Sequence, residues 1–121
     1  MTTYFSEDHE WITVDGDTAT IGITAHAADQ LGEVVFIELK DAEDEFEKGE
    51  EIGVIESVKA ASEIYAPVDC VIIEANETLE GAPGSMNEFA ETDAWIYKIK
   101  ISDAKQLEDL LDEEGYKAFI G

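Results

Sequence analysis

Arginine is absent from this chain, and lysine supplies all seven basic side chains among its 121 residues. The 30 aspartates and glutamates outweigh them, so the formal net charge at pH 7 is −23. Nucleic-acid binding needs a basic surface that neutralises phosphates, and bidentate phosphate clamps use arginine. The composition therefore excludes nucleic acid and disfavours anionic membranes as partners. It favours partners with basic surfaces, although a salt-adapted proteome produces the same acidic excess.

The chain also has a single cysteine, two prolines and no long apolar run. Cys70 has no partner for an internal disulfide, so nothing in the sequence requires an oxidising compartment. Residues 1–8 lack the basic and apolar segments of a secretory signal, and no stretch is long enough to span a membrane. We expect a cytoplasmic protein of bacterial type, or a mature mitochondrial-matrix protein if its source is eukaryotic.

Short β-rich runs separated by turn residues dominate what is present. Residues 10–14 and 18–24 flank an Asp-Gly turn and predict a hairpin. Further strands are expected at 33–39, 52–58, 62–66, 68–75 and 95–101, with loops at 41–51 and around 81–84. Alternation within the run 52–58 would place Ile52, Val54 and Val58 on one face. Many short strands indicate a single, mainly β domain, either a flattened barrel or a sandwich of antiparallel strands.

Two stretches carry helical signals. Thr24 is a good N-cap for a short helix over 25–31, which Gly32 would end. Near the C-terminus, a capping residue at Asp103 precedes leucines at helical spacing, which predicts a C-terminal helix over about 103–114.

The usual catalytic and metal-binding constellations are missing. His9 and His26 are not in metal-ligand spacing, and Cys70 lies in an apolar run with no neighbouring cation to activate its thiol. The acidic residues of 41–51 lack the ligand spacing of a calcium loop. We therefore expect no catalytic residue and no metal site.

Lys59 stands out because of its position, where one predicted strand must reverse into the next. Its neighbours Val58, Ala60 and Ala61 are uncharged and not bulky, so they leave the amine accessible. An accessible amine at a defined place suits a covalent modification. On spacing alone, an ordinary turn lysine remains the alternative.

The segment around this lysine, Glu56-Ser57-Val58-Lys59-Ala60-Ala61-Ser62-Glu63-Ile64-Tyr65-Ala66-Pro67, resembles the lipoyl-attachment segment of the glycine cleavage system H-protein family. His9-Glu10-Trp11 resembles the N-terminal signature of that family, and residues 19–24 and 31–39 match further blocks in the expected order. Similar residues also fall at Asn76, Pro83, Asn87 and Trp95. The resemblance covers nearly the whole chain, from about Tyr4 to Phe119.

This resemblance implies a single lipoyl-carrier domain over residues 1–121 with the lipoyl-domain type of β fold. Lys59 would carry lipoic acid as an amide, added by lipoate-attaching enzymes. The lipoyl arm would shuttle an aminomethyl group from glycine decarboxylase to aminomethyltransferase, and dihydrolipoamide dehydrogenase would reoxidise it. The chain itself would be a carrier and not a catalyst, because the cofactor supplies the redox and group-carrier chemistry.

The resemblance also implies roles for four acidic residues. Glu10, supported by Asp8 and Glu63, would receive the amine at the end of the arm, as carboxylates form charge-assisted hydrogen bonds with cationic amines. Glu56 and Glu63, which flank Lys59, would be recognised by the lipoylating enzyme.

The chain departs from the family pattern at five positions. Lys40 stands where proline is usual, Glu43 and Cys70 where glycine is common, Asp8 where serine is frequent, and Ala94 where glycine is frequent. None of these is the lysine itself, so they bear on the shape of loops and of the cleft.

Other lipoyl and biotinyl proteins fit less well. A biotinyl domain would have methionine on both sides of the lysine, where this chain has Val58 and Ala60, and lipoyl domains of 2-oxo-acid dehydrogenases lack the His9-Glu10-Trp11 start. Two alternatives stay open. One is a lipoyl-relay or regulatory paralogue that keeps Lys59, and the other is a structural homologue that is not lipoylated.

Overall fold

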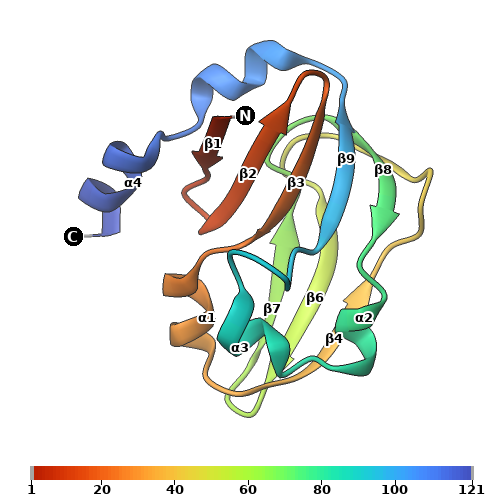
Figure 1. Cartoon of the computed structure of the whole chain (residues 1–121), viewed down its shortest axis with the longest axis vertical. Helices are drawn as coiled ribbons and strands as arrows, with labels where there is room; N and C mark the ends of the chain where they lie inside the picture. Colours follow the sequence, from red (N-terminus) through yellow and green to blue (C-terminus); the bar gives the residue numbers. More distant parts are fainter. Residues whose placement is uncertain (1, 121) are drawn as a thin grey trace.

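Two antiparallel sheets and several short helices form the fold, which a computed structural model describes over residues 2–120 (Figure 1). The strands are β1 (Thr2–Phe5), β2 (Glu10–Asp15), β3 (Thr18–Ile23), β4 (Val34–Leu39), β5 (Glu45–Phe46), β6 (Glu51–Ser57), β7 (Ala61–Tyr65), β8 (Cys70–Ala75) and β9 (Tyr97–Ile101). The helices are α1 (Ala25–Leu31), α2 (Thr78–Gly81), α3 (Ser85–Phe89), the 3₁₀ helix η1 (Ala104–Asp109) and α4 (Glu113–Ile120).

The larger sheet has the strand order β1-β2-β3-β9-β8-β5, and the smaller one has β4-β6-β7. All neighbouring strands in both sheets are antiparallel. Neither sheet closes on itself, so the expected mainly β fold is confirmed in its sandwich form and not as a closed barrel. The turn between β6 and β7 lies at the lower end of Figure 1, where α1 and α3 also lie.

The predicted helix over 25–31 and both of its end signals are confirmed. The side-chain oxygen of Thr24 accepts a hydrogen bond from the backbone N–H of Ala27, as an N-cap residue should. Gly32 ends α1 with φ 75° and ψ −153°, a conformation that residues with a Cβ rarely adopt.

The predicted C-terminal helix is confirmed, but its bounds of about 103–114 are wrong, because the chain forms η1, an extended break and then α4. Leu111 and Phe5 exchange two backbone hydrogen bonds of 2.7 and 2.8 Å, which extends β1 pairing to the break. This pairing requires extended backbone and therefore interrupts the helix. The Asp112 side chain then accepts a hydrogen bond from Gly115 N–H at 2.7 Å, so Gly115 lies in the first turn of α4.

Three other local expectations also fail. The face proposed for Ile52, Val54 and Val58 is wrong: Ile52 is buried and Val54 only partly so, with a register shift between Glu51 and Gly53, while Val58 lies beyond β6 in the turn and is 64% exposed. The region around 81–84 is not plain loop, since α2 and α3 form on either side of it. β1 was not expected as a strand at all.

One departure from the family pattern has a visible backbone consequence. Glu43 adopts φ 77°, in the left-handed region that favours glycine. Its N–H donates to the carbonyl of Ile72 at 2.7 Å, which holds this turn against β8.

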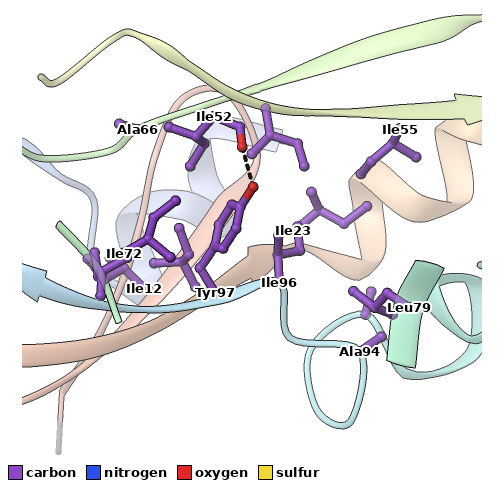
Figure 2. Close-up of a cluster of buried hydrophobic side chains, with 14 of the residues drawn as sticks. Ile12, Ile23, Ile52, Ile55, Ala66, Ile72, Leu79, Ala94, Ile96 and Tyr97 are labelled. Carbon is purple, nitrogen blue, oxygen red and sulfur yellow. Dashed lines mark hydrogen bonds between the residues drawn. The ribbon is translucent and has the colours of Figure 1, made fainter. Parts of the chain in front are cut away.

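Buried side chains from both sheets form one core, and Tyr97 is its largest fully buried member (Figure 2). The Tyr97 hydroxyl donates to the carbonyl of Ile52 on β6 and accepts from the backbone N–H of Lys40 at 2.6 Å. Tyr97 belongs to the larger sheet, and both partners belong to the smaller sheet or follow it directly. This hydroxyl therefore ties the two sheets together inside the core.

We predict that Tyr97→Phe lowers the free energy of unfolding by about 1–3 kcal/mol, because it leaves one buried donor and one acceptor without a partner. Chemical denaturation measures this change. Tyr4→Phe is the matched control, since the Tyr4 hydroxyl has no hydrogen-bond partner among residues 2–120. Equal stability of the two variants would contradict the role given to Tyr97.

Candidate functional site

Lys59 lies in the tight turn that joins β6 to β7, and its side chain is exposed. The Ser57 hydroxyl organises this turn: it donates to the carbonyl of Ala60 at 3.1 Å and accepts from the N–H groups of Lys59 and Ala60 at 3.2 Å each. Ser57 N–H also donates to the Ala60 carbonyl at 2.8 Å. The sequence prediction of a lysine at a defined turn, with an accessible amine, is confirmed by this geometry.

A cleft of about 170 Å³ lies between the two sheets and α1. It is lined by Asp8, Glu10 and Glu63, which come from the β1–β2 turn, the start of β2 and the middle of β7. The remaining lining residues are His9, Ile23, Ala27, Gln30, Leu31, Ile55, Ser62 and Ile64. The fold therefore brings three predicted acidic residues, 55 positions apart at most, to one apolar-walled cleft.

Glu56 and Lys59 are not among the residues that line this cleft. Glu56 is exposed on β6, where it pairs in register with Phe36 and Ala61. A larger opening of about 500 Å³ between residues 39–42 and 73–80 is lined by none of the predicted site residues.

Glu10 is buried, with 4% of its surface exposed. The Ser6 hydroxyl donates to one carboxyl oxygen at 3.0 Å, and the backbone N–H of Tyr65 donates to the other at 2.8 Å. Ser6 belongs to the turn before β2 and Tyr65 to the end of β7, so the carboxyl group joins the two sheets. Sequence reasoning missed both partners, because a serine and a backbone N–H carry no motif and only the tertiary fold brings Tyr65 to Glu10.

Burial dominates the acid–base behaviour of Glu10. Desolvation raises its pKa to about 8, although the hydrogen bonds from Tyr65 and Ser6 act in the opposite direction, and the nearby charge of Asp8 raises the pKa further. The neutral carboxyl group is therefore favoured near pH 7 while the cleft holds no cation.

His9 shapes the turn between Asp8 and Glu10. It adopts φ 66°, its N–H donates to the Ser6 carbonyl, and its own carbonyl accepts from Thr24 N–H at 2.9 Å. Its Nδ1 lies 2.9 Å from the Tyr116 hydroxyl of α4, and desolvation together with the charge of His26 lowers the pKa of His9. The C-terminal helix thus supports the turn that places Asp8 and Glu10 in the cleft.

Cys70 is buried, and burial raises the pKa of its thiol to about 11, so the reactive thiolate is disfavoured. Within residues 2–120 no group of three or more histidine, cysteine, aspartate or glutamate side chains is arranged to hold a metal ion. No helix in this part of the chain is long and apolar enough to cross a membrane.

Comparisons with known proteins match nearly the full chain. A family model described as glycine cleavage H-protein matches residues 3–121. The glycine cleavage system H protein of Dinoroseobacter shibae is 62% identical over 120 residues, which are 99% of this chain and 98% of that protein. The H protein of Bartonella tribocorum is 49% identical over 119 residues, or 98% of each chain.

The fold comparison gives the same result. The crystal structure of a glycine cleavage system H protein from Mycobacterium marinum has a TM-score of 0.87 to this chain at 28% identity. The match covers 97% of this chain and 94% of that one, so no large part of either fold is left unmatched.

We predict that burial of Glu10 makes the protein less stable as the pH rises. Its folded pKa of about 8 exceeds the usual 4.5, so the stabilisation is fully present below pH 4.5 and is lost as the pH rises through 8. Since one pKa unit is worth about 1.4 kcal/mol, wild type should lose about 3–5 kcal/mol relative to Glu10→Gln between pH 4.5 and 9.

Urea denaturation of both proteins at several pH values measures this difference, and the comparison cancels the titration of the other acidic groups. Glutamine is close in shape: its amide oxygen can accept from Tyr65 N–H, and its amide nitrogen can donate to the Ser6 hydroxyl, which then acts as the acceptor. Parallel stability curves for the two proteins would show that Glu10 is not raised in pKa by burial.

Proposed function

We propose that this chain, which belongs to the glycine cleavage H-protein family, is a lipoyl-bearing carrier of the glycine cleavage system with lipoic acid in amide linkage on Lys59. One observation carries the proposal. The exposed amine of Lys59 sits on an organised turn of the same hairpin whose second strand helps to line an acidic, apolar-walled cleft.

The residues present fit a lipoyl group. Acylation needs an amine that an enzyme can reach, and Lys59 is exposed and forms no salt bridge among residues 2–120. An apolar arm with a polar end needs a cleft of mixed character, and Ile23, Leu31 and Ile64 provide apolar walls beside the carboxyl groups.

The attachment step would use lipoyl adenylate, a mixed anhydride of a carboxylic and a phosphoric acid. The ammonium group of Lys59 first loses a proton, Nζ forms an amide with the lipoyl carboxyl carbon, the bond from that carbon to the phosphate oxygen breaks, and AMP and a second proton leave. The amide is neutral, so the chain exchanges one of its seven positive charges for an arm. Glu56 and Glu63 flank this lysine, and we assign them to recognition by the lipoylating enzyme.

When attached, the lipoyl group would carry the aminomethyl unit of glycine from glycine decarboxylase to aminomethyltransferase, and dihydrolipoamide dehydrogenase would reoxidise it. This chain would position the lipoyl arm and limit its contact with water, and it would supply no catalytic group of its own.

Glu10, Asp8 and Glu63 are assigned to the cationic amine at the end of the arm. An entering cation stabilises the ionised form of Glu10, whose pKa falls when a positive charge replaces water beside it. Glu10 then accepts a charge-assisted hydrogen bond in a site that water reaches poorly. Because the pKa of Glu10 is raised before the arm arrives, the carboxyl group need not be held as an unpaired buried charge until then.

The net charge of −23 supports docking onto enzymes with basic entrances. Such steering raises association rates and weakens as salt screens the charges. Partner binding should therefore depend on ionic strength.

Incubation of the unmodified chain with a lipoate–protein ligase, lipoate and ATP should add a single lipoyl increment, and peptide mapping should place it on Lys59. Lys59→Arg should fold normally and stay unmodified, because the side chain is exposed and a guanidinium is not acylated by this route. Intact-protein mass spectrometry and circular dichroism give the two readouts.

Lysines on β9 and α4, such as Lys98 and Lys117, serve as internal controls and should remain unmodified. An unmodified wild-type chain, next to a fully modified reference lipoyl protein, would overturn the carrier function. A lipoylated chain that does not support glycine decarboxylase would instead favour the lipoyl-relay role.

Glu10→Gln should leave lipoylation unchanged and speed the loss of the aminomethyl group to water about tenfold, because a neutral amide loses the charge-assisted bond, which is worth roughly 1.5–3 kcal/mol. The rate of ammonia release from the loaded protein measures this effect. Glu74→Gln is the matched control, because Glu74 is exposed on β8 and does not line the cleft. An unchanged rate in Glu10→Gln would remove Glu10 from the proposed site.

A further inference from the structure

The turn that carries Lys59 is held from outside its own hairpin. The backbone N–H of Val58, next to Lys59, donates to the carbonyl of Glu33 at 3.0 Å. Glu33 lies in the short link between α1 and β4, and no other hydrogen bond within residues 2–120 reaches the 58–60 turn from another segment. The position of this link therefore sets the position of the turn.

Gly32, the residue before Glu33, supports the stem of the lysine side chain. A Cβ atom added at Gly32 would lie 3.1 Å from Cε of Lys59 and 3.6 Å from both Cδ and Nζ. A side chain at Gly32 would therefore crowd the end of the Lys59 side chain in its present conformation. Gly32 also has φ 75°, so its conformation and its lack of a side chain serve the same link.

Asn87 of α3 holds this link on both sides of Glu33. Its side-chain oxygen accepts a hydrogen bond from Val34 N–H at 2.9 Å, and its side-chain amide donates to the carbonyl of Gly32. The Asn87 side chain therefore fixes the peptide groups on both sides of Glu33, whose carbonyl accepts the hydrogen bond from Val58 N–H. Met86, the preceding residue, is fully buried and anchors α3 in the core.

We propose that Asn87 and Gly32 are positioning residues that fix Lys59 for acyl transfer. Asn87 acts through the 32–34 link and the Val58 hydrogen bond, and Gly32 acts through its positive-φ backbone in that link and through the space that it leaves beside the Lys59 side chain. This inference rests on the proposed lipoylation of Lys59 and goes beyond it, because Asn87 lies 28 positions from the lysine and in another element.

The effect of such positioning falls on rate more than on binding. The Nζ atom must meet the acyl carbon at bonding distance and angle, and displacement by about 1 Å can cost up to two orders of magnitude in rate. Neither residue is acidic, and neither forms a hydrogen bond with Glu56 or Glu63, which we assign to recognition by the lipoylating enzyme. Loss of this positioning of Lys59 should therefore lower kcat for lipoylation and leave KM for the protein nearly unchanged.

The test uses the full-length unmodified chain as substrate of a lipoate–protein ligase with lipoate and ATP. We expect kcat to fall about tenfold or more in both Asn87→Ala and Gly32→Ala, with KM changed by less than about twofold. Initial rates are followed by intact-protein mass spectrometry.

Each variant has a matched control. Asn76→Ala removes another asparagine whose amide holds backbone carbonyls, those of Asp93 and Trp95, with no contact to the Lys59 turn. Gly16→Ala places a Cβ on another glycine with positive φ, 68°, and nothing within 4 Å, so it controls for an alanine at positive φ without touching the lysine. Both controls should keep wild-type kcat at a temperature where thermal unfolding shows all five proteins folded.

A second readout does not depend on any enzyme. Amide hydrogen exchange at Val58 should become faster in Asn87→Ala by about tenfold, because its acceptor on Glu33 is no longer fixed. The Ala66 amide, which donates to the Glu50 carbonyl at 2.8 Å in another part of the fold, should be unchanged. If Asn87→Ala does not fold, Gly32→Ala decides the question through its kcat.

Rates in Asn87→Ala and Gly32→Ala equal to those of their controls would overturn the inference. So would a rise in KM at constant kcat, since that would place these residues in enzyme docking. Failure of the proposed function is recognised separately, because the wild-type chain itself would then take up no lipoyl group.

Discussion

A buried carboxyl group in the lining of the cleft joins the two sheets, and the arrangement of the site depends on it. Glu10 stands at the start of β2 in the larger sheet and bonds to Tyr65 N–H at the end of β7 in the smaller one. Burial of an acidic group costs free energy unless it is neutral or well hydrogen-bonded. Here the hydrogen bonds and the raised pKa together reduce that cost. Tyr97 provides the corresponding link deeper in the core through the Ile52 carbonyl.

The same carboxyl group connects stability with the proposed carrier role. A chain with net charge −23 already has strong repulsion among its acidic groups, and one more buried negative charge would add to it. A neutral Glu10 avoids that addition, and in the proposed role it would ionise when the cationic amine enters the cleft. The residue that joins the sheets would therefore also respond to the cargo, so the stability of the fold and retention of the cargo are coupled.

The Lys59 side chain is exposed, whereas the backbone groups around it are held in place by hydrogen bonds. Lys59 is exposed on a turn of few residues, which leaves it accessible to several enzymes. The groups that orient it are mostly backbone: the Glu33 carbonyl, the bare Gly32 and the turn closed by Ser57. Backbone groups position a neighbour without adding bulk or charge near the amine. An accessible side chain on a fixed base is what an attachment site for a mobile arm requires.

The sequence by itself determined the features that depend on neighbouring residues: the Asp-Gly hairpin, the capped helix over 25–31, and the turn at Lys59 with the segment resembling a lipoyl-attachment site. These follow from local backbone preferences, which a short window of residues contains. The tertiary structure alone decided that Leu111 pairs with Phe5 and breaks the expected C-terminal helix, and that Ser6 and Tyr65 meet at a buried Glu10. It also decided that Asn87 holds the link beneath Lys59. Apart from Ser6, which is four residues from Glu10, these contacts join residues far apart in the chain, and each of them uses at least one backbone group, which every residue carries, so no local pattern could have indicated them.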